Sequence, residues 1–160
     1  MDNYNILPIE KVLEEGIEFA GDVCFSGEWG QYVCSAPIEE GGQPITGIVY
    51  EKFENGNLEY YTYYKNGIMN GISVHFYESG KIKSVSNMYR GTTHGKTVCW
   101  HENGNVMSVA DSKYGFDLTY KEWDESGKLI KEKMELSDFE KGMIEKYDED
   151  EKRWTKSELL

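Results

Sequence analysis

The sequence lacks any long hydrophobic run, and no stretch comes near the ~18–20 consecutive apolar residues that a helix needs to cross a bilayer. Its first residues, Met1 to Asn5, lack the basic start and apolar core of a secretory signal. Cysteine is scarce: Cys24, Cys34 and Cys99 are an odd number at no metal-ligand spacing, so we expect reduced thiols. These absences predict a cytoplasmic protein with no membrane partner.

Basic residues are also few, because 17 Lys and Arg face 29 Asp and Glu, a net charge of −12. Such a surface repels nucleic acid and anionic lipid and favours a basic protein partner. The charge is uneven: residues 1–46 hold nine acids and one base, residues 47–134 hold eleven of each, and residues 135–160 hold nine acids and five bases. We therefore expect an acidic N-terminal capping segment (1–46), a neutral scaffold (47–134) and a C-terminal helix and tail (135–160). General solubility is the alternative explanation of the acidity.

The neutral middle of the chain is repetitive. Glycines recur in three series with a step of 24 residues, shortened to 23 at the end of the second series. The series are Gly47, Gly71 and Gly95; Gly56, Gly80, Gly104 and Gly127; and Gly67, Gly91 and Gly115. Around the second series the text reads ENGNL, ESGKI, ENGNV and ESGKL at 54–58, 78–82, 102–106 and 125–129. This phasing indicates a repeat protein.

Each unit has the composition of a β-hairpin. Asn-Gly and Ser-Gly pairs form tight hairpin turns, because glycine adopts positive φ without steric cost. The flanking segments are rich in Tyr, Val, Ile, Phe and Trp, which favour strands. Four units with structural turns at Gly56, Gly80, Gly104 and Gly127 predict a mainly β fold: an elongated, single-layer antiparallel meander of about eight strands. We expect substitutions at Gly80 or Gly104 to cost more stability than substitutions at Gly16 or Gly142.

Short elements are expected outside the repeats. Residues 8–15 read as a short helix that ends at Gly16, and strand-like pieces within 17–36 are expected to cap the open edge of the meander. Ser137-x-x-Glu140 is a capping box that predicts a helix through about Tyr147, with residues 148–160 frayed. The predicted fold is thus a meander with small helical caps at both ends.

The repeat unit, G-x4-aromatic-x3-G-x-aliphatic, resembles the MORN repeat in its bacterial variant form. The phrase ITGIVYEKFENGNLEYYTYYKNGIMNGISVHFYESGKI is similar to the YwqK-type antitoxin and immunity proteins, which carry such arrays. The resemblance covers residues 45–133, and in the fourth unit Leu118 replaces the first glycine, which suits a terminal repeat. It implies a bacterial protein that binds a toxin.

No catalytic or cofactor motif is present in the sequence. Phosphate loops, HExxH, paired-cysteine metal spacings and nucleophile motifs are all missing, so we expect no enzyme, no cofactor and no metal. His75 and His101 fall on adjacent hairpins about 10 Å apart, too far to share one ion, and are expected to be surface histidines.

Alternation along the strands predicts two different faces. We expect an apolar face with Tyr50, Val74 and Val98; Phe76, Trp100 and Trp123; and Leu58, Ile82, Val106 and Leu129. The opposite face is expected to hold Glu51, Phe53, His75, Tyr77 and His101 with Glu59, Tyr61, Tyr63, Val85, Met107 and Asp111. Its tyrosine, histidine and acidic residues suit a recognition surface, although a solvated face has the same composition. One β-bulge would exchange the faces.

The function expected from the resemblance and the charge is that of an immunity protein. It would cover the active site of a basic toxin, the C-terminal domain of a larger secreted protein, and would be a monomer when free. The expected partner-binding residues are Glu28, Trp29, Tyr32, Glu39, Glu40, Glu59, Tyr61, Tyr63, His75, Tyr77 and His101. A competing view places binding on the acidic C-terminal helix with Glu140, Glu145 and Asp148. The alternative function is a non-catalytic MORN-repeat scaffold or membrane-associated interaction module.

Overall fold

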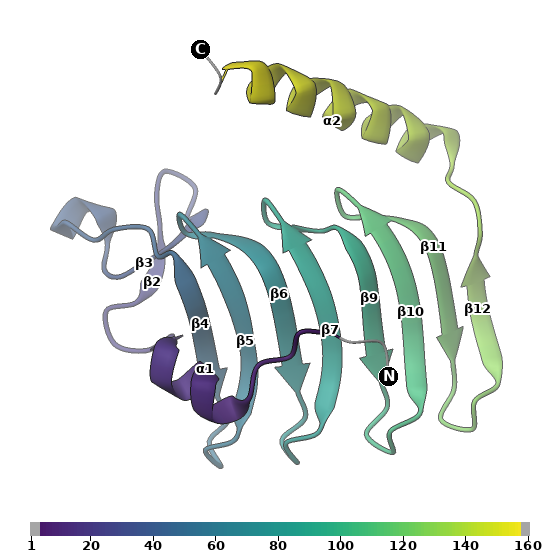
Figure 1. Cartoon of the computed structure of the whole chain (residues 1–160), viewed down its shortest axis with the longest axis horizontal. Coiled ribbons are helices and arrows are strands. Elements are labelled where there is room, and N and C mark those ends of the chain that lie inside the picture. The colour runs from purple at the N-terminus through teal and green to yellow at the C-terminus, as the bar shows by residue number, and fades with distance from the viewer. Residues whose placement is uncertain (1–3, 158–160) are drawn as a thin grey trace.

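The computed structural model describes residues 4–157, in which most strands join one long antiparallel sheet (Figure 1). The elements are α1 (Ile9–Glu15), β1 (Ile17–Glu18), β2 (Cys24–Ser26), β3 (Tyr32–Cys34), the 3-10 helix η1 (Ile38–Glu40), β4 (Gly47–Lys52), β5 (Leu58–Lys65), β6 (Ile68–Phe76), β7 (Ile82–Tyr89), β8 (Thr92–Thr93), β9 (Gly95–Trp100), β10 (Val106–Lys113), β11 (Phe116–Trp123), β12 (Leu129–Lys133) and α2 (Asp138–Ser157). The sheet order is β1-β4-β5-β6-β7-β9-β10-β11-β12, with β8 beside β7. The expected meander of hairpin repeats is confirmed.

Two kinds of glycine turn build the hairpins. Gly80 and Gly104 have φ of 82° and 92° at the tips of β6–β7 and β9–β10, as the Ser-Gly and Asn-Gly pairs predicted. Between hairpins, Asn66, Arg90 and Tyr114 each precede a glycine and have φ of 51°, 48° and 53°. Two successive positive φ values give the twist that a two-residue hairpin turn requires. Asn is common in this region, whereas Arg and Tyr are rare there, so these two turns hold strained backbone.

A β-bulge recurs beside the tip of every hairpin. On β5, Tyr60 lies opposite Glu51 but Leu58 lies opposite Lys52, so Glu59 is the extra residue. The registers of the other three hairpins skip Lys83, Met107 and Ile130 in the same way. Because one extra residue reverses the alternation, side chains three positions apart share a face on each second strand.

The bulge corrects the expected assignment of the two faces. Tyr61 lies opposite Tyr50 and Val74, and Val85 lies opposite Val74 and Val98. The placement of Tyr61, Tyr63, Val85 and Asp111 on the polar face was therefore wrong, and all four belong to the apolar face.

The main core lies between the apolar face and the N-terminal segment. Val12 of α1 is fully buried, and the Leu7 N–H donates to the Tyr61 hydroxyl at 2.9 Å. Farther along, the Tyr4 ring meets the Trp100 ring edge-on with centroids 6.3 Å apart. Figure 1 shows this segment crossing the sheet, with α1 beside β4 and β5. A second cluster on the opposite face contains Val33, Ile45, Val49 and Tyr64.

Only part of the expected N-terminal cap lies on the sheet edge: β1 pairs with the edge strand β4, whereas β2 and β3 form a separate two-stranded sheet. Helix α1 ends before Gly16, and β1 pairs in parallel with β4, which covers that edge of the sheet. The expected tolerance of Gly16 was wrong: a Cβ there would lie 2.5 Å from the Val12 carbonyl oxygen and 2.8 Å from the Tyr50 ring. Gly142 has no such neighbour within 4 Å.

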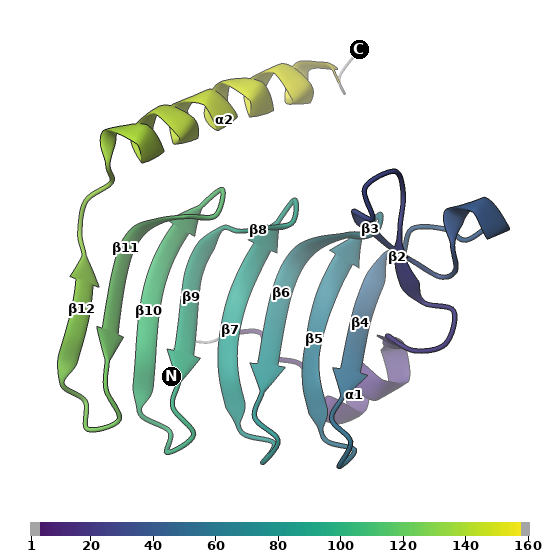
Figure 2. The ribbon, with the colours of Figure 1, turned by 180° about the vertical axis from the view of Figure 1, so that it is seen from behind.

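Helix α2 starts as predicted but does not end as predicted. The Ser137 N–H and hydroxyl both donate to the Glu140 carboxylate at 2.8 Å, which is the capping box. The helix then continues to Ser157, so the expected frayed tail was wrong over residues 148–157, and residues 158–160 lie outside the described part. The helix does not cap the end of the array but runs back along the turns between hairpins (Figures 1 and 2). Neither helix within residues 4–157 is long and apolar enough to cross a membrane.

Candidate protein-docking surface

The β2–β3 hairpin presents two large aromatic side chains to solvent. Trp29 is 83% exposed at its tip, and Phe25 is 64% exposed on β2. The tip is ordered by local hydrogen bonds, since the Gly30 N–H donates to the Gly27 carbonyl at 3.0 Å and the Trp29 N–H donates to Gln31 Oε1 at 2.8 Å. Gly27 and Gly30 both have positive φ, which explains the need for glycine at both positions. Trp29 is therefore held out by a defined turn.

Backbone hydrogen bonds fasten this hairpin to the repeat array. The Val33 N–H donates to the Gly67 carbonyl at 2.8 Å, and the Gly67 N–H donates to the Ile45 carbonyl at 2.7 Å. The Ser26 hydroxyl accepts from the Ile38 N–H at 3.0 Å, which joins the hairpin to η1. The β2–β3 hairpin, with its aromatic side chains, and η1, with its carboxylates, are thus joined to each other and to the repeat array.

Exposed acidic residues lie on the same hairpin and on η1, which is bonded to it. Glu28 precedes Trp29, while Glu39 and Glu40 lie on η1, and all three are exposed. The one basic residue among positions 1–46, Lys11, lies 3.8 Å from Glu15. Tyr32 is half-buried next to the turn of the hairpin, opposite Ser26 and close to Gly67. We name Phe25, Glu28, Trp29, Glu39 and Glu40 the cap surface.

Figure 2 shows the face of the sheet on which the β2–β3 hairpin lies. His75 lies on this face, because it pairs with Tyr60 and alternates with Val74 of the apolar face, and the bulged Glu59 precedes Tyr60. The His75 ring packs on the Tyr60 ring with centroids 5.5 Å apart, while its edge stays exposed. Partial burial and the nearby Lys83 lower the pKa of His75, and Glu59 opposes this shift. Burial, and then the Glu51 charge, raise the pKa of Tyr60. This patch is an aromatic–imidazole stack rather than a second acidic surface.

Four of the expected binding residues have other roles. Tyr61 is 0% exposed in the core, so its assignment to a binding surface was wrong. Tyr63 is exposed, but on the apolar face. The Tyr77 hydroxyl donates to the Trp100 carbonyl at 2.7 Å, and His101 Nε2 lies 2.8 Å from the Trp123 carbonyl oxygen. Because these two residues occupy equivalent repeat positions, both contacts tie one hairpin to the next.

Sequence reasoning missed Phe25 and the attachment of α2. Phe25 lies in a strand of only three residues, which is too short for the sequence to show which side chains face the core and which face solvent. The attachment of α2 depends on residues far apart in the chain. The Tyr89 hydroxyl donates to Glu151 Oε1 at 2.5 Å. The Tyr114 hydroxyl lies 2.5 Å from Glu151 Oε2 and 2.8 Å from Asp148 Oδ1 and shares its one proton between the two carboxylates. Such pairs leave no local signal.

Further contacts complete this attachment, which we name the α2 clasp (Tyr89, Arg90, Lys113, Tyr114, Asp148, Glu151 and Trp154). Lys113 Nζ lies 2.7 Å from Asp148 Oδ1, and the Arg90 guanidinium lies 4.9 Å from the Trp154 ring centroid. Hydrogen bonds from the Tyr114 and Tyr89 hydroxyls lower the pKa of Glu151. The two residues with strained backbone, Arg90 and Tyr114, therefore both contact α2 through their side chains.

The described residues hold no group of three or more His, Cys, Asp or Glu that could bind a metal. Cys24 and Cys34 lie opposite each other in the β2–β3 register, and both are free thiols. Burial raises the pKa of Cys34, which keeps this thiol protonated and weakly nucleophilic.

Parts of the chain are similar to known proteins. The MORN repeat variant family matches residues 45–66, 69–88 and 116–134, which contain the β4–β5, β6–β7 and β11–β12 hairpins. The Immunity protein YwqK of Bacillus subtilis (strain 168) is 37% identical over 67 residues, which are 42% of this chain and 42% of that protein. The match thus spans less than half of the relative's length. No solved structure matches the chain.

Proposed function

We propose that this chain, a MORN-repeat protein of the YwqK type, is an immunity protein that binds a toxin and blocks it. The observation that carries the proposal is the cap surface: an exposed Trp and Phe on an ordered hairpin, with exposed carboxylates on the same hairpin and on the attached η1. Exposed aromatic side chains at a rigid position are typical of interface hot spots. The partial similarity to an immunity protein points to a toxin as the partner.

In the proposed mechanism, the cap surface enters a basic cleft of the toxin and keeps substrate out. Phe25 and Trp29 supply most of the affinity, because truncating such anchors costs ~2 kcal/mol or more. Glu28, Glu39 and Glu40 raise the association rate by attracting the basic partner, an effect that weakens as salt increases. Inhibition requires only binding, so the chain acts without catalysis, cofactor or metal.

The proposal assigns a different task to each region of the chain. Within residues 1–46, the β2–β3 hairpin and η1 form the binding surface, residues 47–134 are the scaffold, and α2 braces the scaffold through the α2 clasp. Glu59 and His75 lie on the same side as the cap and extend the contact if the toxin reaches along the sheet. The free protein is proposed to be a cytoplasmic monomer.

The test is a growth assay in bacteria that express the cognate toxin domain, which is to be sought in the reading frames next to the one for this chain. The double variant Phe25→Ala/Trp29→Ala is expected to lose protection while remaining folded. Its control, Phe139→Ala, removes an exposed Phe (71%) from α2 outside the α2 clasp and is expected to protect. Protection by the cap variant and its loss in the α2 variant would place binding on the acidic helix and refute the proposal.

A further inference from the structure

Cys24 and Cys34 form a cross-strand pair in the β2–β3 hairpin. They are direct Cα partners in the antiparallel register, so their side chains leave the same face of the hairpin. Both are free thiols, as is Cys99. Burial, and then the charge of Cys24, raise the pKa of Cys34, which agrees with a short distance between the two sulfur atoms.

Backbone hydrogen bonds on the outer side of β3 define the spacing of this pair. The Val33 N–H donates to the Gly67 carbonyl at 2.8 Å, and the Val33 carbonyl accepts from the Ile45 N–H at 2.9 Å. Val33 thus turns its polar backbone groups away from β2. Because these groups alternate along a strand, those of Cys34 point toward Cys24. Such hydrogen-bonded pairs have Cα atoms about 5.5 Å apart, within the range of about 4.4–6.8 Å that disulfides span.

The two thiols differ in their access to solvent. Cys24 is partly exposed, whereas Cys34 is 0% exposed, with its sulfur 3.8 Å from the Tyr32 carbonyl oxygen. An oxidant in solution therefore meets Cys24 first, and Cys34 is placed to react with the product. Within the described part of the chain β2 pairs with β3 alone, so β2 can move toward β3 as the sulfur atoms approach each other.

We infer that Cys24 and Cys34 are a site of reversible disulfide formation, for which a small disulfide is the oxidant. The Cys24 thiolate attacks one sulfur of the small disulfide, the S–S bond of that molecule breaks, and its other sulfur leaves as a thiolate. The Cys34 thiolate then attacks the Cys24 sulfur of the mixed disulfide and displaces the second small thiolate. The protein loses two electrons to the small disulfide, and the two thiol protons of the cysteines end on the two small thiols.

The disulfide would fasten the aromatic part of the cap surface to the array. β3 is bonded to the array through Val33, whereas Phe25 lies on β2 directly after Cys24. The Cβ atoms of a hydrogen-bonded pair are about 5.5 Å apart, against about 3.5–4.5 Å in a disulfide, so closing the bond strains the hairpin. Strained disulfides are readily reduced, so the bond forms under oxidation and opens again in a reducing compartment. The inference goes beyond the proposed function and does not depend on it.

The test uses the purified full-length protein and oxidised glutathione. Thiol labelling in denaturant is expected to fall from three cysteines to one, with a mass lower by two hydrogen atoms, and excess reduced glutathione should restore all three. A glutamate-specific protease cuts after Glu18, Glu28 and Glu39, so the disulfide would join fragments 19–28 and 29–39 in an unreduced digest. The variant Cys99→Ser is expected to oxidise like the wild type, whereas Cys24→Ser forms no bond within the chain.

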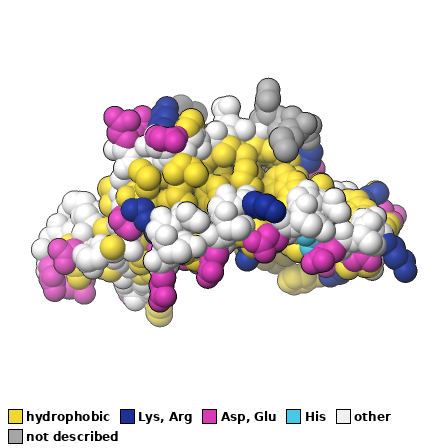
Figure 3. Space-filling model, turned by 90° about the horizontal axis from the view of Figure 1, so that it is seen from below, with side chains coloured by type: hydrophobic (Ala, Val, Ile, Leu, Met, Phe, Trp, Pro, Cys, Tyr) yellow, Lys and Arg dark blue, Asp and Glu magenta, His cyan; other side chains and the backbone are white. Residues whose placement is uncertain are grey.

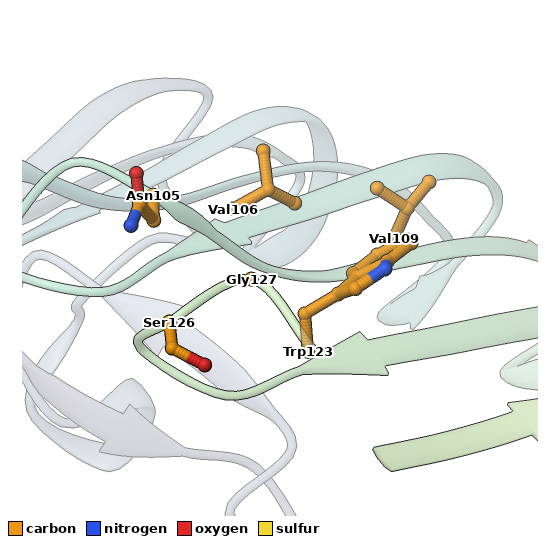
Figure 4. A pocket seen from close by; sticks show the side chains of 6 residues that line it. All are labelled: Asn105, Val106, Val109, Trp123, Ser126 and Gly127. Atoms are coloured by element: carbon orange, nitrogen blue, oxygen red, sulfur yellow. The ribbon is translucent and has the colours of Figure 1, made fainter. Parts of the chain in front are cut away.

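The indole N–H resonances, assigned by single Trp→Phe variants, report where the oxidised protein changes. Trp29 lies between the two cysteines in the chain and should shift on oxidation in the wild type but not in Cys24→Ser. Trp123 is the internal control, because β11 lies five strands from β5, about 24 Å. It belongs to the apolar face, along which hydrophobic side chains gather in a band (Figure 3), and its ring lies alongside Val109 (Figure 4). Its resonance should stay unchanged.

Three results would overturn the inference. They are three labelled thiols after oxidation, a stable glutathione adduct on Cys24, and a disulfide that includes Cys99. The digest distinguishes them, because each leaves a different modified or linked fragment. These measurements are made on the wild type, so they hold even if a cysteine variant folds poorly. They involve no toxin, so their failure would leave the proposed function to its own test.

Discussion

The Tyr61 hydroxyl provides a quantitative test of how the N-terminal segment is held. Its ring is fully buried, and its oxygen accepts the Leu7 N–H at 2.9 Å across the apolar face. The substitution Tyr61→Phe keeps the ring but removes the acceptor. An unsatisfied buried donor costs about 1–3 kcal/mol, and Leu7 is only half-buried, so water compensates in part. We therefore expect the free energy of unfolding to fall by about 1–2 kcal/mol.

The assay is urea denaturation of the wild type, Tyr61→Phe and the control Tyr63→Phe. Tyr63 is exposed on the same face, so its variant is expected to stay within about 0.5 kcal/mol of the wild type. Hydrogen exchange of residues 4–12 should also become faster in Tyr61→Phe alone. Equal stability of the two variants, with unchanged exchange, would refute the role of this bond.

The remaining predictions concern the glycines, the clasp and the cap. Gly80→Val forces a branched side chain to φ near 82°, so the free energy of unfolding should fall by about 1–3 kcal/mol in denaturant melts. Gly142→Ala lies in open space on α2 and should raise the free energy of unfolding by about 0.5–1 kcal/mol. The reverse order would contradict the hairpin geometry. Their partners in the α2 clasp lower the pKa values of Asp148 and Glu151. The stability that the clasp contributes is therefore fully present above the unfolded pKa values of about 4 and is lost as the pH falls from there through the lowered folded values. Faster hydrogen exchange in α2 at acidic pH would detect this loss. Trp29→Ala should melt like the wild type, because this side chain is exposed; a clear loss of stability would mean that Trp29 belongs to the core.

The hairpins and their turns were predictable because their signal is local. Asn-Gly and Ser-Gly pairs determine the turn wherever they stand between strand-forming segments, and the 24-residue step repeats that signal. The bulges were not predictable, since the extra residues Glu59, Lys83, Met107 and Ile130 share no chemistry. Without them, alternation places the second strands on the wrong face, and this error put Tyr61 among the expected binding residues.

The local sequence predicts the exposed residues near the N-terminus better than it predicts the structure of the C-terminal helix. Trp29 was predictable as an exposed residue because it lies between Gly27 and Gly30 in an acidic segment. The length of α2 was not, because residues 148–151 are held by tyrosines on distant turns, up to 62 positions away. Charge composition alone predicts a frayed tail there, and tertiary contacts override it.

The dissociation constant of the toxin complex tests the central proposal most directly. It should be measured by titration calorimetry with the purified toxin domain for the wild type, Phe25→Ala/Trp29→Ala and the α2 variant Phe139→Ala. The proposal predicts at least about a 100-fold weaker complex for the cap variant, roughly 2.7 kcal/mol, and wild-type affinity for the α2 variant. Wild-type affinity of a folded cap variant would contradict it.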